Sequence, residues 1–199
     1  MRFSRLISAC LFTLIMIFNQ NSALAFKIEG LTIVGLINAA QTVSTTSGVT
    51  SRTEGLLGFG GGILKDFDFK PRNFSIQSGL LYTKRNYGMS NSYTNSTTWL
   101  QVPLLARKNI WIFNLGLGGY LDFALGNLSH DASGTVTTST ISSNMKTFDY
   151  GFQGALGTTV FKKIFLDFRY SIGLANLTLG TPNTLTFDEM GLILGYRFN

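Results

Sequence analysis

Apolar and polar residues alternate along most of this chain, with a period of two residues. The clearest case is segment 111–123, where one set of alternate positions is apolar and the other is small or polar. Successive side chains of a β-strand point to opposite sides of a sheet, so this alternation predicts a strand with one apolar face. Its length, about 13 residues, exceeds the usual 5–6 and fits a tilted strand that crosses a bilayer. The apolar positions are Trp111, Phe113, Leu115, Leu117, Leu121 and Phe123, and the others are Asn114, Gly116, Gly118, Tyr120 and Asp122.

Seven further segments alternate in the same way, which brings the expected number of strands to eight. They lie around residues 31–37, 57–63, 74–83, 100–107, 148–157, 164–173 and 189–198. The connections between them also alternate in character. Three are short and charged (65–72, 107–109 and 161–163), and four are long and rich in Ser, Thr, Asn and Gly (43–54, 86–95, 125–144 and 175–184). Short periplasmic turns and long external loops are typical of bacterial transmembrane barrels, so we expect both termini on the periplasmic side.

A soluble β-sandwich is the alternative architecture, because its strands alternate as well. The outward faces of a sandwich carry charge, whereas only 13% of this chain is charged, about half the usual share. Aromatic residues also lie near the expected strand ends, as in the girdles at membrane interfaces: Tyr82, Trp99, Trp111, Tyr150, Phe161, Tyr170, Tyr196 and Phe198. Since hydrocarbon tolerates no open sheet edge, the pattern predicts an all-β, eight-stranded, antiparallel, transmembrane up-and-down β-barrel.

The first 25 residues are typical of a cleavable signal peptide. Arg2 and Arg5 precede the apolar run 6–18, and small residues at the cleavage positions end the segment at Ala25. The run is short for a transmembrane helix, which needs about 20 residues. A lipoprotein-type cut at Cys10 would leave almost no apolar stretch before it. We therefore expect residues 1–25 to be removed and residues 26–199 to form the outer-membrane barrel.

Composition narrows the expected chemistry further. Removal of Arg2 and Arg5 lowers the net charge from +6 to +4, and no basic cluster points to nucleic acid. Cys10 is the single cysteine and falls in the signal peptide, so the barrel is expected to contain no disulfide and no cysteine-bound metal. With one histidine in the chain, we predict no metal site and no cofactor.

Six charged residues are expected to point into the barrel lumen. Such residues could line a gate or an ion path, or they could pair with one another and fill the lumen. The interior of an eight-stranded barrel is just wide enough for side chains to fill, and buried charges must pair. We therefore favour a filled lumen over a porin, with a narrow channel for small solutes as the alternative. The six residues are Asp122, Asp149, Asp167, Arg169, Glu189 and Arg197.

An enzymatic alternative depends on His130, which lies beside Asp131 and near Ser129 and Ser133. Some eight-stranded barrels modify lipids with a histidine and a serine, but a catalytic triad requires a geometry that sequence spacing does not show. A solvated loop histidine is the simpler interpretation, and we predict no catalytic residue. The glycine-rich segments 58–62 and 116–119 lack the Lys-Ser/Thr of a phosphate-binding loop and are interpreted as strand glycines.

Four segments, taken in order, resemble the PorT-like family of outer-membrane β-barrels common in Bacteroidetes. They are 76–85 (IQSGLLYTKR), 99–106 (WLQVPLLA), 114–120 (NLGLGGY) and 165–174 (FLDFRYSIGL). The ending 194–198 (LGYRF) resembles the signal read by the barrel-assembly machinery, although Asn199 follows the usual terminal Phe. The resemblance implies a barrel, an outer-membrane location, and contact with outer-membrane lipids and that machinery. It implies no settled activity: a structural, adhesive or secretion-accessory role, with an unidentified protein partner, is expected.

Overall fold

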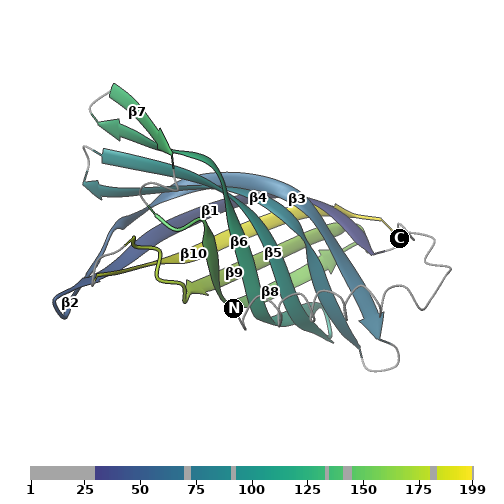
Figure 1. Cartoon of the computed structure of the whole chain (residues 1–199). Helices are drawn as coiled ribbons and strands as arrows, with labels where there is room; N and C mark the ends of the chain where they lie inside the picture. Colours follow the sequence, from purple (N-terminus) through teal and green to yellow (C-terminus); the bar gives the residue numbers. More distant parts are fainter. Residues whose placement is uncertain are drawn as a thin grey trace, which may run out of the picture.

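The computed structural model describes residues 30–69, 73–90, 93–132, 135–140, 145–179 and 183–198. Within them, ten β-strands form one antiparallel sheet (Figure 1). Eight long strands make the wall of a barrel: β1 (Leu31–Thr46), β3 (Glu54–Phe69), β4 (Phe74–Ser90), β5 (Tyr93–Ile110), β6 (Phe113–Ala132), β8 (Phe148–Val160), β9 (Ile164–Gly173) and β10 (Thr184–Arg197). Two short strands, β2 (Val49–Arg52) and β7 (Thr135–Thr140), extend the sheet past the wall. The predicted signal peptide, residues 1–25, lies outside the described residues.

The barrel closes where the last strand meets the first. β10 pairs with β1 in antiparallel register from Thr32 opposite Arg197 to Thr45 opposite Thr184. The other wall strands pair with their neighbours in chain order. Within the described residues the wall therefore has no open edge that would leave backbone groups unpaired. This order confirms the predicted eight-stranded up-and-down barrel.

Side chains alternate between the lumen and the outer surface, as the sequence predicts. Along β9, exposed residues from Ile164 to Ile172 alternate with buried ones from Phe165 to Gly173. The outer surface carries a band of large apolar side chains, of which Leu117 is 74% exposed. A band of this kind requires contact with lipid, because water-soluble surfaces rarely carry so large an apolar patch.

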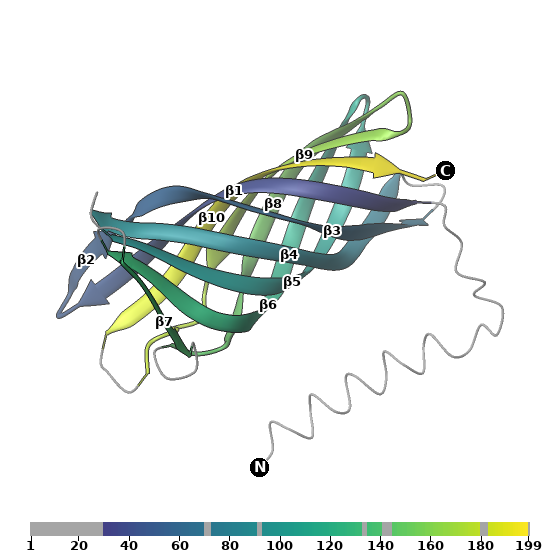
Figure 2. The ribbon, with the colours of Figure 1, turned by 90° about the horizontal axis from the view of Figure 1, so that it is seen from above.

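The two ends of the barrel differ. Both described ends of the chain lie at the end with the short turns (Figure 2), where Gly30 N donates to Phe198 O at 2.8 Å and Arg197 N donates to Lys163 O at 2.7 Å. We call this the turn end. The opposite end carries β2 and β7, and we call it the hairpin end.

Strands extend into the segments that the sequence suggested were loops. β1 and β2 form a hairpin across 43–52, and β6 pairs with β7 over Asn127–Ala132. Serine and threonine fit strands well, and their hydroxyls can pair across a hairpin: Ser44 Oγ and Ser51 Oγ lie 2.8 Å apart. The prediction of loops is therefore wrong for these two segments, which form polar hairpins that project beyond the wall.

The turn between β5 and β6 is also placed differently from the prediction. β5 continues through residues 107–109 to Ile110, and the turn consists of Trp111 and Ile112. Trp111 has a φ of 56°, the left-handed conformation that a tight two-residue hairpin requires. The tryptophan is 90% exposed, so it lies at the rim of the turn end and not inside a strand.

The prediction that Trp99 belongs to an outer aromatic girdle is wrong. Trp99 and Gln101 share a face of β5, because they are two residues apart, and that face points into the lumen. The Trp99 side chain is fully buried, and its Nε1 donates to Thr97 Oγ1 at 2.9 Å. The position of Trp99 near a strand end predicts a place in the girdle. The alternation of side chains along the strand decides whether the residue faces the lumen or the lipid.

Gly118 on β6 lies against the backbone of β5. A Cβ atom at Gly118 would lie 2.0 Å from the carbonyl oxygen of Leu104 and 2.9 Å from the Cα of Leu105. These are backbone atoms, which cannot move aside unless the strand moves. A glycine is therefore required here by the close approach of two strands.

We expect Gly118→Ala to lower the free energy of unfolding by about 1–3 kcal/mol, the usual cost of overpacking. Gly154→Ala is the matched control, because a Cβ there would meet only Leu117 Cδ2, at 3.8 Å. Urea unfolding of protein inserted in lipid vesicles measures both variants. Equal losses in the two variants would contradict the packing argument.

Candidate functional site in the barrel lumen

The lumen contains charged side chains from seven of the wall strands. They are almost all buried and are joined by ion pairs and hydrogen bonds into two groups, one toward each end of the barrel. The arginines are Arg85, Arg107, Arg169 and Arg197, and the acids are Asp66, Asp122, Asp149, Asp167 and Glu189.

Arg85 forms the centre of the group nearer the hairpin end. Its Nη2 and Nε donate to Asp122 Oδ2 and Glu189 Oε2, each at 2.5 Å, and its Nη1 lies 3.8 Å from Asp149 Oδ2. Asn38 Nδ2 donates to the other oxygen of Glu189 at 2.9 Å. The three carboxylates come from β6, β8 and β10, so one guanidinium on β4 connects strands around the barrel.

An aromatic layer covers this group on the hairpin side. The Arg85 guanidinium lies 5.3 Å from the ring of Trp99 and 5.4 Å from that of Phe187, within the range of cation–π attraction. Phe187 also packs edge-on against Tyr87, with ring centroids 5.2 Å apart. Met145, Ala175 and Leu177 complete a buried apolar cluster with these aromatic residues. Water at the hairpin end is therefore separated from the ion pairs by packed side chains.

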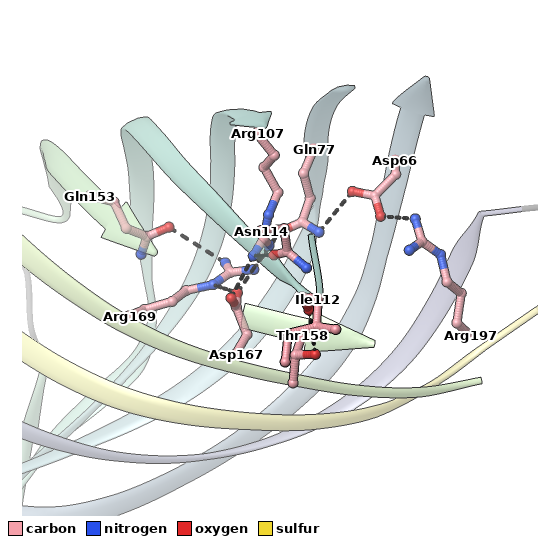
Figure 3. A network of polar contacts seen from close by, with 10 residues as sticks. All are labelled: Asp66, Gln77, Arg107, Ile112, Asn114, Gln153, Thr158, Asp167, Arg169 and Arg197. Carbon is pink, nitrogen blue, oxygen red and sulfur yellow. Dashed lines mark hydrogen bonds and ion pairs between the residues drawn. The ribbon is translucent and has the colours of Figure 1, made fainter. Parts of the chain in front are cut away.

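Arg107 and Arg169 hold the group nearer the turn end (Figure 3). Arg107 makes two bonds to the Asp167 carboxylate, at 2.5 and 3.0 Å, and Arg169 Nε donates to Asp167 Oδ2 at 2.9 Å. A fork-to-carboxylate pair of this geometry is among the strongest polar contacts in proteins. Arg107 also donates to Asn114 Oδ1. Asp167 is thus shared by two arginines that project from β5 and β9.

Gln77 links this group to the rim of the turn end. Its Oε1 accepts hydrogen bonds from Arg107 at 2.7 Å and from Arg169 at 2.6 Å, and its Nε2 donates to Asp66 Oδ1 at 2.8 Å. Asp66 in turn pairs with Arg197 (Figure 3), whose side chain is 20% exposed. The polar network therefore runs from the middle of the lumen to its rim at the turn end.

Little free space remains between the two groups. A small cavity of about 10 Å³ lies beside Gln101, Gln153 and Arg169 on one side and Leu36 and Ile193 on the other. This volume matches about one water molecule. Apolar side chains fill the rest of that level: Val34, Leu36, Leu64, Leu81, Phe165 and Ile193.

The six residues expected in the lumen do not form one network. Asp122, Asp149 and Glu189 gather at Arg85, while Asp167 and Arg169 meet at Arg107, and Arg197 at the rim reaches this second group through Asp66 and Gln77. That these residues carry a function stays a prediction. With the arginines at their centres included, three carboxylates surround Arg85 in one half of the lumen. In the other half, Arg107, Arg169 and Arg197 pair with the two carboxylates of Asp66 and Asp167.

Sequence analysis missed the arginines at the centre of both groups. The predicted strand 74–83 stops short of Arg85, and Asp66 falls in the predicted turn 65–72. Arg107 falls on the polar face at the end of the predicted strand 100–107, where the turn 107–109 begins, but it is not among the six charges expected in the lumen. A longer alternation would have found them, since Arg85 continues the inward series of Gln77 and Thr83 on β4. To find these residues, one would need to know where each strand ends, and the sequence indicates strand ends poorly.

Comparison with known proteins identifies the family. Residues 24–179 match the family described as "Outer membrane protein beta-barrel domain". The chain belongs to this family.

The chain is also similar to solved structures. Ail, the attachment invasion locus protein of Yersinia pestis, matches 85% of this chain over 99% of its own, with 15% identity and a TM-score of 0.50. Neisserial surface protein A matches 85% of this chain over 100% of its own, with 14% identity and a TM-score of 0.47. At such identities a likeness to Ail concerns the fold alone. No curated protein is similar enough to count as a relative.

Membership in the family places this barrel in the bacterial outer membrane, with transmembrane strands and a surrounding of membrane lipid. In the described part of the chain, no helix has the length and apolar character needed to span a membrane. The same part holds no group of three or more His, Cys, Asp or Glu side chains arranged to bind a metal ion.

The position of His130 is given by the backbone alone. It lies in β6, opposite Asn95 on β5 and Thr137 on β7, so it belongs to a projecting hairpin and not to an irregular loop. Ser133, one of its sequence neighbours, lies outside the described residues.

We expect Arg107→Met to lower the free energy of unfolding by about 3–5 kcal/mol, because it leaves a buried carboxylate with half of its partners. Arg197→Met is the comparison: Arg197 is one-fifth exposed, and its partner Asp66 keeps the hydrogen bond from Gln77, so a smaller loss is expected. Equilibrium unfolding in urea, followed by tryptophan fluorescence, measures both. A loss in Arg107→Met no larger than that in Arg197→Met would refute the central place of Asp167 in the network.

Proposed function

We propose that this protein is a closed, non-enzymatic outer-membrane barrel that presents polar hairpins outside the cell to a protein partner. The observation that carries the proposal is the filled lumen. Two arginine-centred groups, an apolar layer and an aromatic layer occupy it, and the cavity between them measures about 10 Å³. Among the described residues, this cavity holds about one water molecule.

The buried ion pairs make an ion path unfavourable. A permeating ion would have to separate Asp167 from two arginines, or Arg85 from three carboxylates. Removal of one partner from a buried pair costs about 3–5 kcal/mol. A narrow channel for small solutes is therefore the less favoured candidate, and these charges serve to hold the wall strands together.

The orientation belongs to the same proposal. The turn end, with both described chain ends, faces the periplasm, and the hairpin end faces outward, as the usual short and long connections of such barrels suggest. The strands that extend past the wall are rich in Ser and Thr residues such as Ser44, Thr45 and Thr138, which suit water and not hydrocarbon. Residues 1–25 would direct export and be removed, and 194–198 would be read by the barrel-assembly machinery.

The resemblance to PorT-like barrels suggests one form of partner. Segments 76–85, 99–106 and 165–174 line β4, β5 and β9 of the wall, so the resemblance concerns the barrel itself and not the hairpins. If the partner belongs to a secretion system, an accessory role in secretion follows. Capture of the barrel with secretion components, lost when β2 is shortened, would support this narrower assignment.

We expect the purified barrel to show no stable openings in planar lipid bilayers. Trp99→Ala is expected to stay closed as well, because the Arg107 group still fills the lumen below the aromatic layer. Unboiled samples that migrate faster than boiled ones on gels serve to verify folding. Stable, large conductance steps from the folded wild type would overturn the closed-barrel proposal.

Orientation can be tested with single cysteines, because Cys10 is the only natural one. Ser51→Cys in the β1–β2 hairpin is expected to react with a membrane-impermeant maleimide on intact cells, and Lys163→Cys in the turn end only after lysis. Both side chains are exposed, so access to the reagent decides the result. The reverse pattern would place the hairpins in the periplasm.

A further inference from the structure

A hollow lies on the outer surface of the barrel at the hairpin end, where β8 begins and β9 ends. Its volume is about 490 Å³, and Lys146 is its one charged residue. Lys146 is exposed, and one of its three Nζ protons is donated to the carbonyl oxygen of Asn176 at 2.8 Å. The remaining lining is polar or apolar: Met145, Thr147, Phe148, Tyr150, Ala175, Asn176 and Leu179. Among these described residues none is acidic, so the hollow favours an anion.

The walls of this hollow are held in place by hydrogen bonds. Lys146 N donates to Leu177 O at 2.9 Å, and Ala124 N donates to Thr147 O at 2.8 Å. On the facing segment, Asn176 Oδ1 accepts from Thr178 N, Thr178 Oγ1 and Leu185 N at 3.1, 2.8 and 3.1 Å. The hollow is thus formed before any ligand arrives, which reduces the cost of binding.

An apolar groove lies lower on the same face. Its volume is about 560 Å³, and its outward walls are Leu117, Phe152, Tyr170 and Ile172. The groove exists because Gly154 occupies an outward position of β8, where a Cβ would meet only Leu117 Cδ2, at 3.8 Å. One missing side chain in a band of large ones therefore leaves a furrow that faces the hydrocarbon.

The hollow and the groove follow one another along β8. Phe148 and Tyr150 line the first, and Phe152 and Gly154 line the second, so four successive outward positions connect them. From Phe148 to Gly154, β8 rises roughly 20 Å, which at a tilt near 40° is roughly 15 Å across the membrane. This depth is similar to half of the hydrocarbon core of a bilayer. A lipid with its phosphate in the hollow would reach the groove with its acyl chain.

We propose that this face binds one lipid A moiety of lipopolysaccharide from the outer leaflet, with a phosphate on Lys146 and an acyl chain in the Gly154 groove. The choice of lipid A over a glycerophospholipid depends on the proposed outward orientation of the hairpin end. A phosphate accepts charge-assisted hydrogen bonds from the free Lys146 protons, and the chain fills a furrow that loosely packed annular lipid would fill poorly.

The test uses folded, delipidated barrel in detergent, titrated with purified lipid A and monitored by native mass spectrometry. Lys146→Gln is expected to weaken binding roughly five-fold, since a lysine near an anionic surface contributes about 1 kcal/mol. Gly154→Leu fills the groove and is expected to weaken binding about ten-fold, the effect of losing roughly two buried methylenes.

Two variants serve as matched controls. Gly35→Leu makes the same change at another outward glycine with nothing within 4 Å of its Cβ, on β1. Lys108→Gln removes an exposed lysine at the turn end of β5. Both are expected to bind lipid A like the wild type, and all four variants should keep the heat-modifiable migration of the folded barrel.

Three outcomes would overturn the proposal: no saturable lipid A binding, equal losses in the site and control variants, or equally tight binding of phosphatidylglycerol. The last two would indicate ordinary annular lipid or a glycerophospholipid site. Because binding in detergent depends on neither conductance nor orientation, a failure here is distinguishable from a failure of the proposed function, which the bilayer and maleimide measurements detect.

Discussion

The structure depends on one constraint: a backbone N–H or C=O inside hydrocarbon must be paired within the protein. An open sheet leaves a row of such groups at each edge, and each would cost several kcal/mol in lipid. The pairing of β10 with β1 removes both edges of the wall at once. Polar hairpins such as β1–β2 can keep an open edge because they extend past the wall.

Closure with eight strands then determines the lumen. Alternate residues of every strand must point inward, and the space they share is just wide enough for side chains. Charges that enter it lose water and have to find partners. Arg85 and Arg107 satisfy this requirement for carboxylates from β6, β8, β9 and β10. The same contacts that pair the charges also fill the barrel and connect opposite walls.

The outer face differs from the lumen in the residues that cover it. Large apolar side chains cover it, and two residues interrupt this cover. Gly154 leaves a furrow, and Lys146 places a positive charge at the upper end of the furrow. The lumen and the outer face thus divide the two tasks of the protein. The lumen stabilises the wall, whereas the outer face contacts lipid.

The sequence by itself determined the class of fold, the number of wall strands and the side to which most residues point. These follow from a local rule, since a strand turns each successive side chain to the opposite face. It did not determine where strands end, because Ser and Thr are compatible with both strands and loops. Trp99, Arg85 and Asp66 were therefore misplaced or missed. Which charges meet was decided only by the tertiary structure: Arg85 and Glu189 are 104 residues apart, and the register between strands, not any local pattern, brings them into contact.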